Sequence, residues 1–113
     1  MDDDAVPSEG SRGRLLARLA PQGVGLRLGV TAVNASWPFP RAFAVYEGGI
    51  FVSSLGTSAW IPRDSISSLH RGPGNIRVKW ELGGGTSSAT VSSWFHIGRV
   101  EQALTSAGYH VLH

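Results

Sequence analysis

The spacing of apolar residues changes once along this chain, from every second residue to a helical spacing. Short segments in which every second residue is apolar run from about Leu26 to Val91, and one segment at about His96–Ala107 has helical spacing instead. In the clearest short segment, Ile76–Leu82, apolar and charged residues alternate throughout. Such alternation is typical of a strand with one buried and one solvated face. Several strands followed by one helix predict a mainly β fold, a small barrel or curved antiparallel sheets, capped by the C-terminal helix.

The length and composition indicate one globular domain. The chain has 113 residues, 42% of them hydrophobic and 16% charged, which is enough for one core and too few for two. Residues 1–13 are acidic, then rich in Ser and Gly, and have no hydrophobic period, which predicts a disordered tail. We therefore expect a single domain over residues 14–113. Its first segment, Arg14–Ala20, is predicted to form one or two helical turns that pack on the domain and end at Pro21.

The strand boundaries follow from alternation and from turn residues. Gly48-Gly49 and the Gly-rich run at residues 83–85 predict hairpin turns, because Gly adopts positive φ without steric cost. Asn34–Pro40 contains two prolines that cannot donate to a ladder and is predicted to be a loop. The expected strands are Leu26–Val33, Arg41–Glu47, Ile50–Ser54, Ser58–Ile61, Ile66–His70, Ile76–Leu82 and Thr86–Ser92.

The terminal helix is predicted from an apolar stripe and from its end signals. The stripe consists of Ile97, Val100, Ala103, Leu104 and Ala107. Ser92 or Ser93 is expected to cap the amino end, and Gly108 to follow the carboxyl end. Gly98 either permits a close approach to the sheets or belongs to a frayed first turn.

The tryptophans other than Trp37 are assigned structural roles. Trp80 shares the apolar face of its strand and is expected in the core. Trp60 is expected to seal the barrel wall, and Trp94-Phe95 to seat the helix.

The charge distribution leaves the domain basic. The formal net charge is +2, but four of the eight acidic residues lie in the first nine positions, so four acids face ten bases in the rest of the chain. Nine of these bases are Arg, which pairs with phosphate or carboxylate. Heavy use of Arg, Gly and Ala also follows from GC-rich coding, which is the interpretation that we favour and which indicates a bacterial source.

The sequence also limits the cellular setting. The absence of Cys excludes disulfides and thiolate chemistry. The sequence has no apolar run long enough to span a bilayer and no pattern of a secretory signal. We expect a cytoplasmic protein, with peripheral contact at the inner membrane face as the alternative.

The residues supply little catalytic chemistry. Of the four His, only His110 and His113 are closely spaced, and no neighbouring carboxylate accompanies them in the sequence, so neither a metal site nor a cofactor is predicted. Four acids in the domain are a poor supply for paired-carboxylate catalysis. The Gly-rich runs lack the residues of a phosphate-binding loop. We expect a non-enzymatic protein, and a small-ligand or enzymatic barrel is the least favoured alternative.

Five residues are candidate binding residues. Trp37 lies between Ser and Pro in the predicted loop, where its ring either pins the loop, which we favour, or contacts a partner together with Phe39 and Arg41. Arg77 and Lys79 share the polar face of one strand and would suit anionic lipid or nucleic acid, although a merely solvated face is the interpretation that we favour. Nucleic acid is disfavoured further, because no RNA-binding or helix-turn-helix pattern is present.

The order of elements and several local phrases resemble small bacterial pleckstrin-homology-like (PH-like) domains. The phrases that carry the resemblance are Trp37-Pro38-Phe39, Val45-Tyr46-Glu47-Gly48-Gly49-Ile50 and Trp60-Ile61-Pro62-Arg63-Asp64-Ser65-Ile66. Over about Gly25–Val111, the resemblance implies a barrel plugged by its helix and a scaffold that binds lipids, peptides or other proteins. Members that bind phosphoinositides hold several Lys and Arg in the first inter-strand loop. The corresponding segment here, Asn34–Arg41, offers only Arg41.

These observations together predict a binding module. The expected partner is a protein, a peptide or a second copy of the chain, bound at an exposed patch around Trp37–Phe39 or at an unpaired strand edge. The alternative is peripheral binding to anionic membrane lipids through five cations, which are Arg14, Arg18, Arg41, Arg77 and Lys79.

Overall fold

The structure, a computed structural model, describes residues 13–19, 21–28, 31–82, 85–93 and 96–113. The predicted disordered tail therefore lies outside the described residues except for Gly13, and so does Trp94-Phe95. The elements are β1 (Leu15–Leu19), β2 (Gly23–Leu28), β3 (Thr31–Ser36), β4 (Arg41–Tyr46), β5 (Gly49–Ser54), β6 (Thr57–Pro62), the short 3₁₀ helix η2 (Arg63–Ser65), β7 (Ile66–Gly72), β8 (Asn75–Leu82), β9 (Gly85–Ser92) and α2 (Ile97–Ser106).

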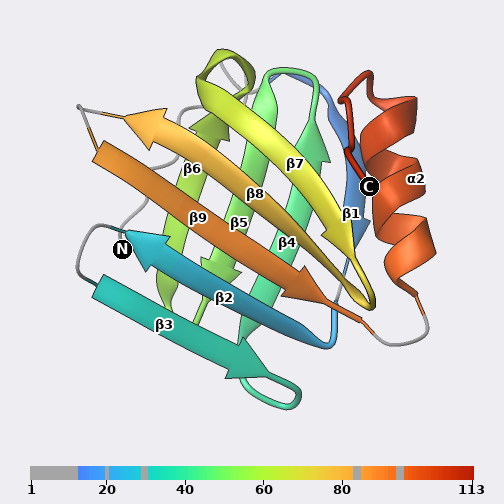
Figure 1. The fold of residues 1–113 in the computed structure, drawn as a ribbon. Coiled ribbons are helices and arrows are strands. Elements are labelled where there is room, and N and C mark those ends of the chain that lie inside the picture. Colours follow the sequence, from blue (N-terminus) through green and yellow to red (C-terminus); the bar gives the residue numbers. More distant parts are fainter. Residues whose placement is uncertain (1–12, 20, 29–30, 83–84, 94–95) are drawn as a thin grey trace.

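The strands form two antiparallel sheets that cross face to face (Figure 1). One sheet has the order β1-β4-β5-β6 and the other the order β3-β2-β9-β8-β7. The helix α2 lies along one side, next to β1 (Figure 1), and also contacts β8. The predicted mainly β fold with two antiparallel sheets and one C-terminal helix is confirmed. Among the described residues the sheets stay separate and do not close into a barrel.

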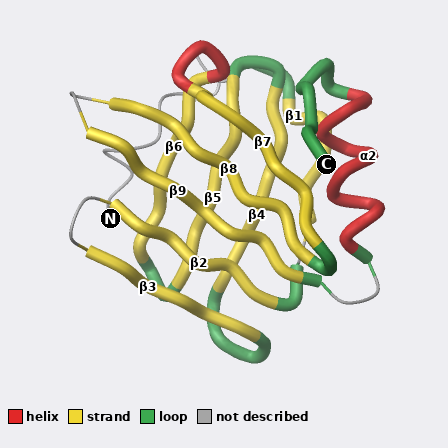
Figure 2. The backbone as a smooth tube through the Cα atoms, in the orientation of Figure 1, coloured by secondary structure: helices red, strands yellow, loops and turns green. Residues whose placement is uncertain are grey.

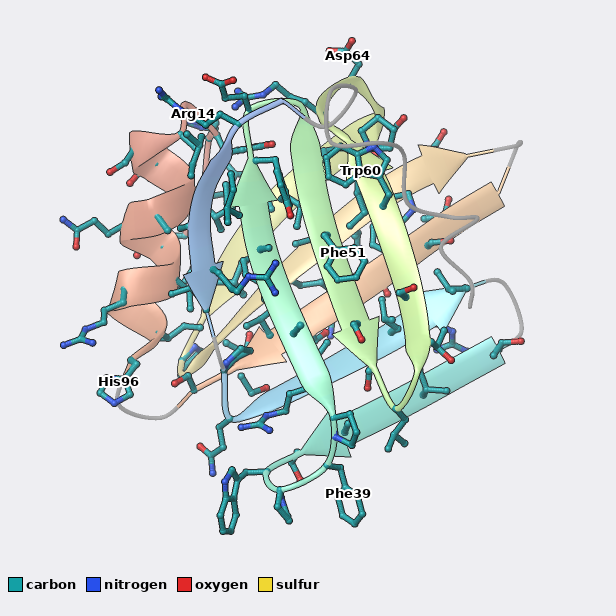
Figure 3. All side chains as sticks on the ribbon, turned by 180° about the vertical axis from the view of Figure 1, so that it is seen from behind. Arg14, Phe39, Phe51, Trp60, Asp64 and His96 are labelled. Atoms are coloured by element: carbon teal, nitrogen blue, oxygen red, sulfur yellow. The ribbon has the colours of Figure 1, made fainter. Side chains whose placement is uncertain are left out.

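The core fills the space between the two sheets. β8 buries alternate residues, as its sequence period predicts: Ile76 and Val78 are fully buried, and Trp80 is 1% exposed. β4 buries four consecutive residues, Phe43–Tyr46. Leu104 of α2 closes the side of this core. The predicted core position of Trp80 is confirmed, whereas Trp60 is half-buried on the outer face of the four-stranded sheet (Figure 3).

The prediction of helical turns over Arg14–Ala20 is wrong. Leu15–Leu19 forms β1, which pairs with β4 from Leu15 opposite Tyr46 to Leu19 opposite Phe43. A helix of two turns is marginal on its own, because few backbone bonds offset the cost of nucleation. Pairing with the edge of β4 satisfies the same backbone groups within a sheet, so the strand is preferred.

The prediction of one strand over Leu26–Val33 is also wrong. β2 and β3 form a hairpin there, in which Leu28 lies opposite Thr31. The apolar period continues unbroken through this turn in the sequence, so alternation alone could not locate it. The part of the predicted loop before Trp37 belongs to β3.

The helix is confirmed, but its predicted amino-terminal cap is wrong. His96 occupies the cap position without a side-chain cap bond. Ser93 is buried instead, and its N–H donates to the Gly74 carbonyl at 2.9 Å. At the other end Gly108 has a φ of +90°. The N–H groups of Gly108 and Tyr109 donate to Thr105 and Leu104, each at 3.0 Å, which is a Schellman motif.

The chain after the helix returns to the edge of β7 (Figure 2). Leu112 forms a parallel bridge with His70, and its N–H donates to the Leu69 carbonyl at 2.8 Å. The N–H of Arg71 donates to the Leu112 carbonyl at 2.7 Å. This edge of the five-stranded sheet is therefore covered by the chain itself.

Candidate functional site

The five predicted binding residues lie on two separate surfaces. Trp37, Phe39 and Arg41 lie at the connection between β3 and β4, whereas Arg77 and Lys79 lie on the outer face of β8. We call residues 37–40 the aromatic loop. We call the outer face of the five-stranded sheet the basic face.

The aromatic loop exposes its side chains to solvent. Trp37 is 73% exposed and Phe39 58% exposed, and Phe39 projects from the end of the sheets (Figure 3). Leu55, in the turn between β5 and β6, is 48% exposed and donates its N–H to the Pro40 carbonyl at 3.0 Å. These are three of the five large apolar side chains that are exposed in the described part of the chain. All three belong to the two neighbouring turns that this hydrogen bond joins, and we call them the apolar patch. With its ring 73% exposed, Trp37 does not pin the loop, so the favoured interpretation is wrong.

Backbone hydrogen bonds and Arg41 hold the loop instead. The N–H of Trp37 donates to the Gln22 carbonyl at 3.0 Å, and the N–H of Phe39 to the Ser36 carbonyl at 2.8 Å. Arg41 donates from Nε to the Pro21 carbonyl at 2.6 Å and from Nη1 to the Phe39 carbonyl at 3.0 Å. Arg41 therefore supports the loop from behind and is not an additional cation of the exposed patch.

The strand edge beside the aromatic loop is open. Within the described residues β3 pairs only with β2, and Ser36 at its end leads directly into Trp37. The six residues Thr31–Ser36 include neither a charged residue nor Pro. Charged residues and Pro are the usual features that protect an edge strand from pairing. An extended segment of another chain can add to β3 and reach the aromatic loop at the same time.

The basic face carries cations among small polar residues. In the register of the sheet, two rows of side chains cross this face, one of Asn34, Gly25, Thr90, Arg77 and His70, the other of Ala32, Arg27, Ser88, Lys79 and Ser68. The shared polar face of Arg77 and Lys79 is confirmed, since both are exposed on the same side of β8. Sequence reasoning missed Arg27 and His70, because only the pairing of distant strands places them in these rows.

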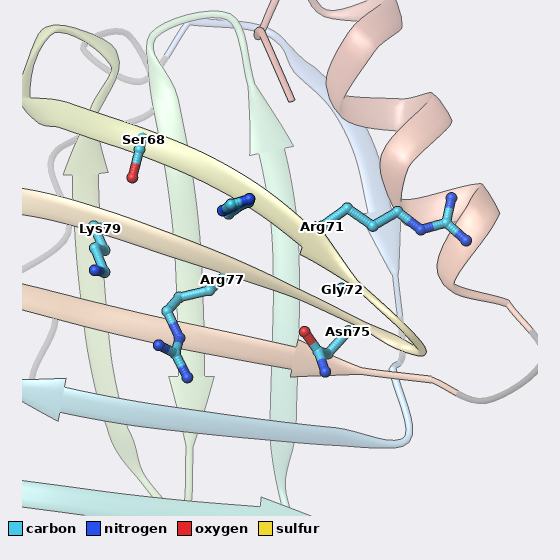
Figure 4. A pocket seen from close by; sticks show the side chains of 7 residues that line it. Ser68, Arg71, Gly72, Asn75, Arg77 and Lys79 are labelled. Atoms are coloured by element: carbon cyan, nitrogen blue, oxygen red, sulfur yellow. The ribbon is translucent and has the colours of Figure 1, made fainter. Parts of the chain in front are cut away.

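Two shallow hollows open on the basic face, one on each side of β8. The first lies between β7 and β8, with Lys79 and Arg77 at its rim (Figure 4). The second lies over β3, β2 and β9, and its polar lining includes Arg27, Asn34, Arg77 and the hydroxyl residues of β9. Figure 4 shows the Arg77 side chain extending from β8 across β9 toward β2, whereas Arg71 is directed toward α2.

The cations of the basic face have no acidic partner among the described residues. Neither a hydrogen bond nor an ion pair there involves the side chains of Arg27, Arg77 or Lys79. Glu81 is the acidic residue that β8 presents on this side, and it lies beyond Lys79 and away from Arg77. The second hollow therefore combines two unpaired guanidinium groups with hydrogen-bond donors and contains no carboxylate.

The cations expected to contact a membrane do not lie on one surface. Arg18 is exposed on the outer face of the four-stranded sheet, opposite to the basic face. Arg14 lies at the start of β1, with its Nη2 3.6 Å from Oε2 of Glu47. A flat bilayer cannot contact these residues and Arg77 together.

The C-terminal histidine has a carboxylate neighbour that its sequence spacing did not predict. His113 and Arg71 both pair with Glu101 of α2. The hydrogen bond from His113, and then that from Arg71, holds the pKa of Glu101 below its usual range, while partial desolvation opposes this. In the part of the chain that the structure describes, no three His, Asp or Glu side chains gather as metal ligands. No described helix is both long and apolar enough to cross a bilayer.

Comparison with models of known protein families finds no match to this chain. Comparison with curated proteins finds no significant match either.

Proposed function

We propose that this chain is a non-enzymatic binding module with a PH-like scaffold, and that it binds an extended segment of a protein partner. The observation that carries the proposal is the continuity of an open strand edge with an exposed apolar patch, β3 followed by Trp37 and Phe39. The order of two antiparallel sheets and a C-terminal helix supports the scaffold. The proposed PH-like scaffold consists of these two sheets with the helix at their side, without the closed barrel that the resemblance implies.

The edge and the patch supply different parts of the binding energy. A segment added to β3 gains main-chain hydrogen bonds that are independent of its sequence. Burying the exposed parts of Trp37 and Phe39 contributes on the order of 5 kcal/mol before the costs of association. The apolar patch therefore selects partners with an apolar side chain beyond the end of the paired segment.

The aromatic loop is already ordered for binding. Its backbone is held by Gln22, Ser36 and the two hydrogen bonds of Arg41. A loop fixed in advance loses little conformational entropy when a partner binds, which raises affinity for the same contact area.

A second copy of the chain is the simplest partner of this kind. Antiparallel pairing of β3 with its own copy gives a two-fold dimer in which each edge satisfies the other. In that dimer the two aromatic loops lie at opposite ends of the paired strands, each next to the end at which β3 of the partner copy begins.

Sedimentation equilibrium of the full chain tests the proposal for self-association. The wild-type protein is expected to dimerise, and the double variant Trp37→Ser/Phe39→Ser to dimerise at least about tenfold more weakly, a loss of about 1.4 kcal/mol. Leu15→Ser is the matched control, because Leu15 is exposed on β1 away from the loop. Equal dimerisation of the double variant and the wild type would refute binding through this surface.

A second experiment tests for partners other than a second copy of the chain. The wild type, the double variant and the Leu15→Ser control are each immobilised and exposed to extract of the source cells. The proposal expects a protein that the wild type and the control retain and that the double variant loses. A monomeric wild type together with identical retained proteins for all three forms contradicts it.

A further inference from the structure

We infer that the hollow over β3, β2 and β9, which Arg27 and Arg77 line, binds the phosphate group of a soluble phosphomonoester. This site lies on the basic face and does not depend on the aromatic loop or on the proposed partner binding at β3. The inference rests on the arrangement of donors around the hollow, on its shape and on its charge.

Strand register places the two arginines on opposite sides of β9. Arg77 lies opposite Thr90, and Arg27 opposite Ser88. Neighbouring strands are about 4.8 Å apart, so the strands that carry the arginines are separated by about 10 Å across β9. Two extended guanidinium side chains and one phosphate span this distance. The direction of the Arg77 side chain, across β9 toward β2, agrees with this arrangement (Figure 4).

The floor of the hollow exists because position 25 has no side chain. Gly25 lies opposite Thr90 on one side and Asn34 on the other. A Cβ added there would be in van der Waals contact with the Asn34 side chain, 3.6 Å from its Oδ1, and would occupy part of the hollow that Gly25 lines. The glycine thus leaves room for a ligand between the Asn34 amide and the Thr90 hydroxyl.

The polar side chains around the hollow are all hydrogen-bond donors. Each guanidinium offers N–H groups in a fork that matches two oxygens of one anion, and Ser88, Thr90 and Asn34 add hydroxyl and amide donors. A phosphomonoester carries a charge of about −1.5 to −2 at pH 7 and three free oxygens. A carboxylate has only two oxygens and one charge, so it uses fewer of these donors.

The composition of the basic face argues for a soluble ligand. The two rows of residues that cross it hold no Phe, Tyr or Trp on which a nucleic-acid base would stack, and the one imidazole, that of His70, does not line this hollow. They also hold no large apolar side chain that would insert into a lipid surface. Two soluble ligands carry the phosphomonoester group that these residues would bind, a phosphorylated small molecule and a phosphorylated side chain.

Titration of the ¹⁵N-labelled full chain at constant ionic strength tests the inference. The probes are inorganic phosphate, glycerol phosphate and N-acetyl-phosphoserine amide. A single-stranded oligonucleotide and vesicles containing phosphatidic acid are titrated for comparison. The expected result is a saturable shift of amides in β2, β8 and β9, with a Kd below about 1 mM. Relative affinity of the last two probes distinguishes a small-molecule ligand from a phosphorylated side chain.

Three variants and one control separate this site from general attraction of anions. Arg27→Gln and Arg77→Gln should each weaken binding at least about tenfold, and Gly25→Val should weaken it by filling the hollow without changing charge. Arg18→Gln removes an exposed strand arginine from the opposite face and should leave the affinity unchanged. Amide spectra report whether each variant is folded.

Several outcomes overturn the inference. Shifts that do not saturate, or equal weakening by Arg18→Gln, mean that the protein attracts anions without a defined site. Tighter binding to single-stranded oligonucleotide than to any phosphomonoester assigns the basic face to nucleic acid instead. Binding that requires vesicles containing phosphatidic acid assigns it to a membrane surface.

Discussion

The guanidinium carbon of Arg63 lies 4.0 Å from the centre of the Tyr109 ring. The same side chain donates from Nη2 to the Ala107 carbonyl at 2.6 Å and from Nε to the Glu47 carbonyl at 3.1 Å. Arg63 therefore joins η2, the turn after β4 and the carboxyl end of α2. This junction, formed by one residue, attaches the helix to the sheets.

Removing Arg63 should weaken this attachment. Arg63→Ala is expected to lower the free energy of unfolding by about 1–3 kcal/mol, because two hydrogen bonds and a cation–π contact are lost. Urea denaturation measures the change. Arg99→Ala, an exposed arginine on the same helix, is the control and should change it by less than about 0.5 kcal/mol. Equal losses in the two variants contradict the role given to Arg63.

Stability should fall in alkali because of Tyr109. Burial raises the pKa of Tyr109 above its usual value, and the nearby Arg63 charge partly opposes this. The folded state therefore favours the protonated phenol, whose stabilising effect is present below about pH 10 and is lost as the pH rises through the folded-state pKa. Urea denaturation between pH 8 and pH 11.5 should show this loss, and Tyr109→Phe should diminish it. If Tyr109→Phe loses as much unfolding free energy between pH 8 and pH 11.5 as the wild type does, the loss is not caused by ionisation of Tyr109.

Stability should also fall in acid because of Glu101. Its pKa is lowered by the hydrogen bonds from His113 and Arg71, so the carboxylate form stabilises the folded state. This effect is present above the unfolded pKa, about 4.5, and is lost as the pH falls through the lower folded-state pKa. Denaturation curves from pH 6 to pH 2 for the wild type and for Glu101→Gln measure it. The free energy of unfolding should fall less between pH 6 and pH 2 in Glu101→Gln than in the wild type, and an equal fall contradicts the role given to Glu101.

A methyl group at position 49 should destabilise the fold. A Cβ on Gly49 would lie 2.3 Å from the Ile61 carbonyl oxygen and 2.8 Å from Cζ2 of Trp60. Gly49→Ala is expected to cost about 1–3 kcal/mol by overpacking. Nothing lies within 4 Å of a Cβ on Gly98, so Gly98→Ala should instead stabilise by up to about 1 kcal/mol. Thermal unfolding of both variants tests this: the midpoint should fall for Gly49→Ala and rise for Gly98→Ala.

The strands after Pro40 could be predicted because their signals are local. Alternation and turn glycines locate β4 to β9 to within two residues at each end. The same signals fail for β1, a short edge segment whose state depends on pairing with β4. They also fail at the turn between β2 and β3, where apolar spacing continues through the turn.

The candidate sites were less predictable, because they depend on contacts between distant parts of the chain. A spacing of two residues was enough to place Arg77 and Lys79 on one face. Arg27 joins them only through the register of β2, β9 and β8. The loop that carries the exposed Trp37 is held in part by the hydrogen bond from Arg41 to the Pro21 carbonyl, which no local pattern indicates.

The two tryptophans at the extremes of exposure should respond differently to substitution. Trp80 is 1% exposed, and Trp80→Ala is expected to cost about 3–5 kcal/mol of unfolding free energy. Trp37 is 73% exposed, and Trp37→Ser should leave the unfolding free energy within about 0.5 kcal/mol of the wild type. Urea denaturation compares them. A large loss for Trp37→Ser means that the ring supports the fold and is not available to a partner.

Site-specific photo-crosslinking tests the central claim of a protein-binding surface most directly. A benzophenone side chain replaces Phe39 in the full chain, expressed in its source cells, and a second form carries the group at Leu15 as the control. The account predicts one discrete crosslinked protein, or a crosslinked dimer, from position 39, absent from position 15 and lost when Trp37→Ser is added. Identical products from the two positions, or none from position 39, contradict it.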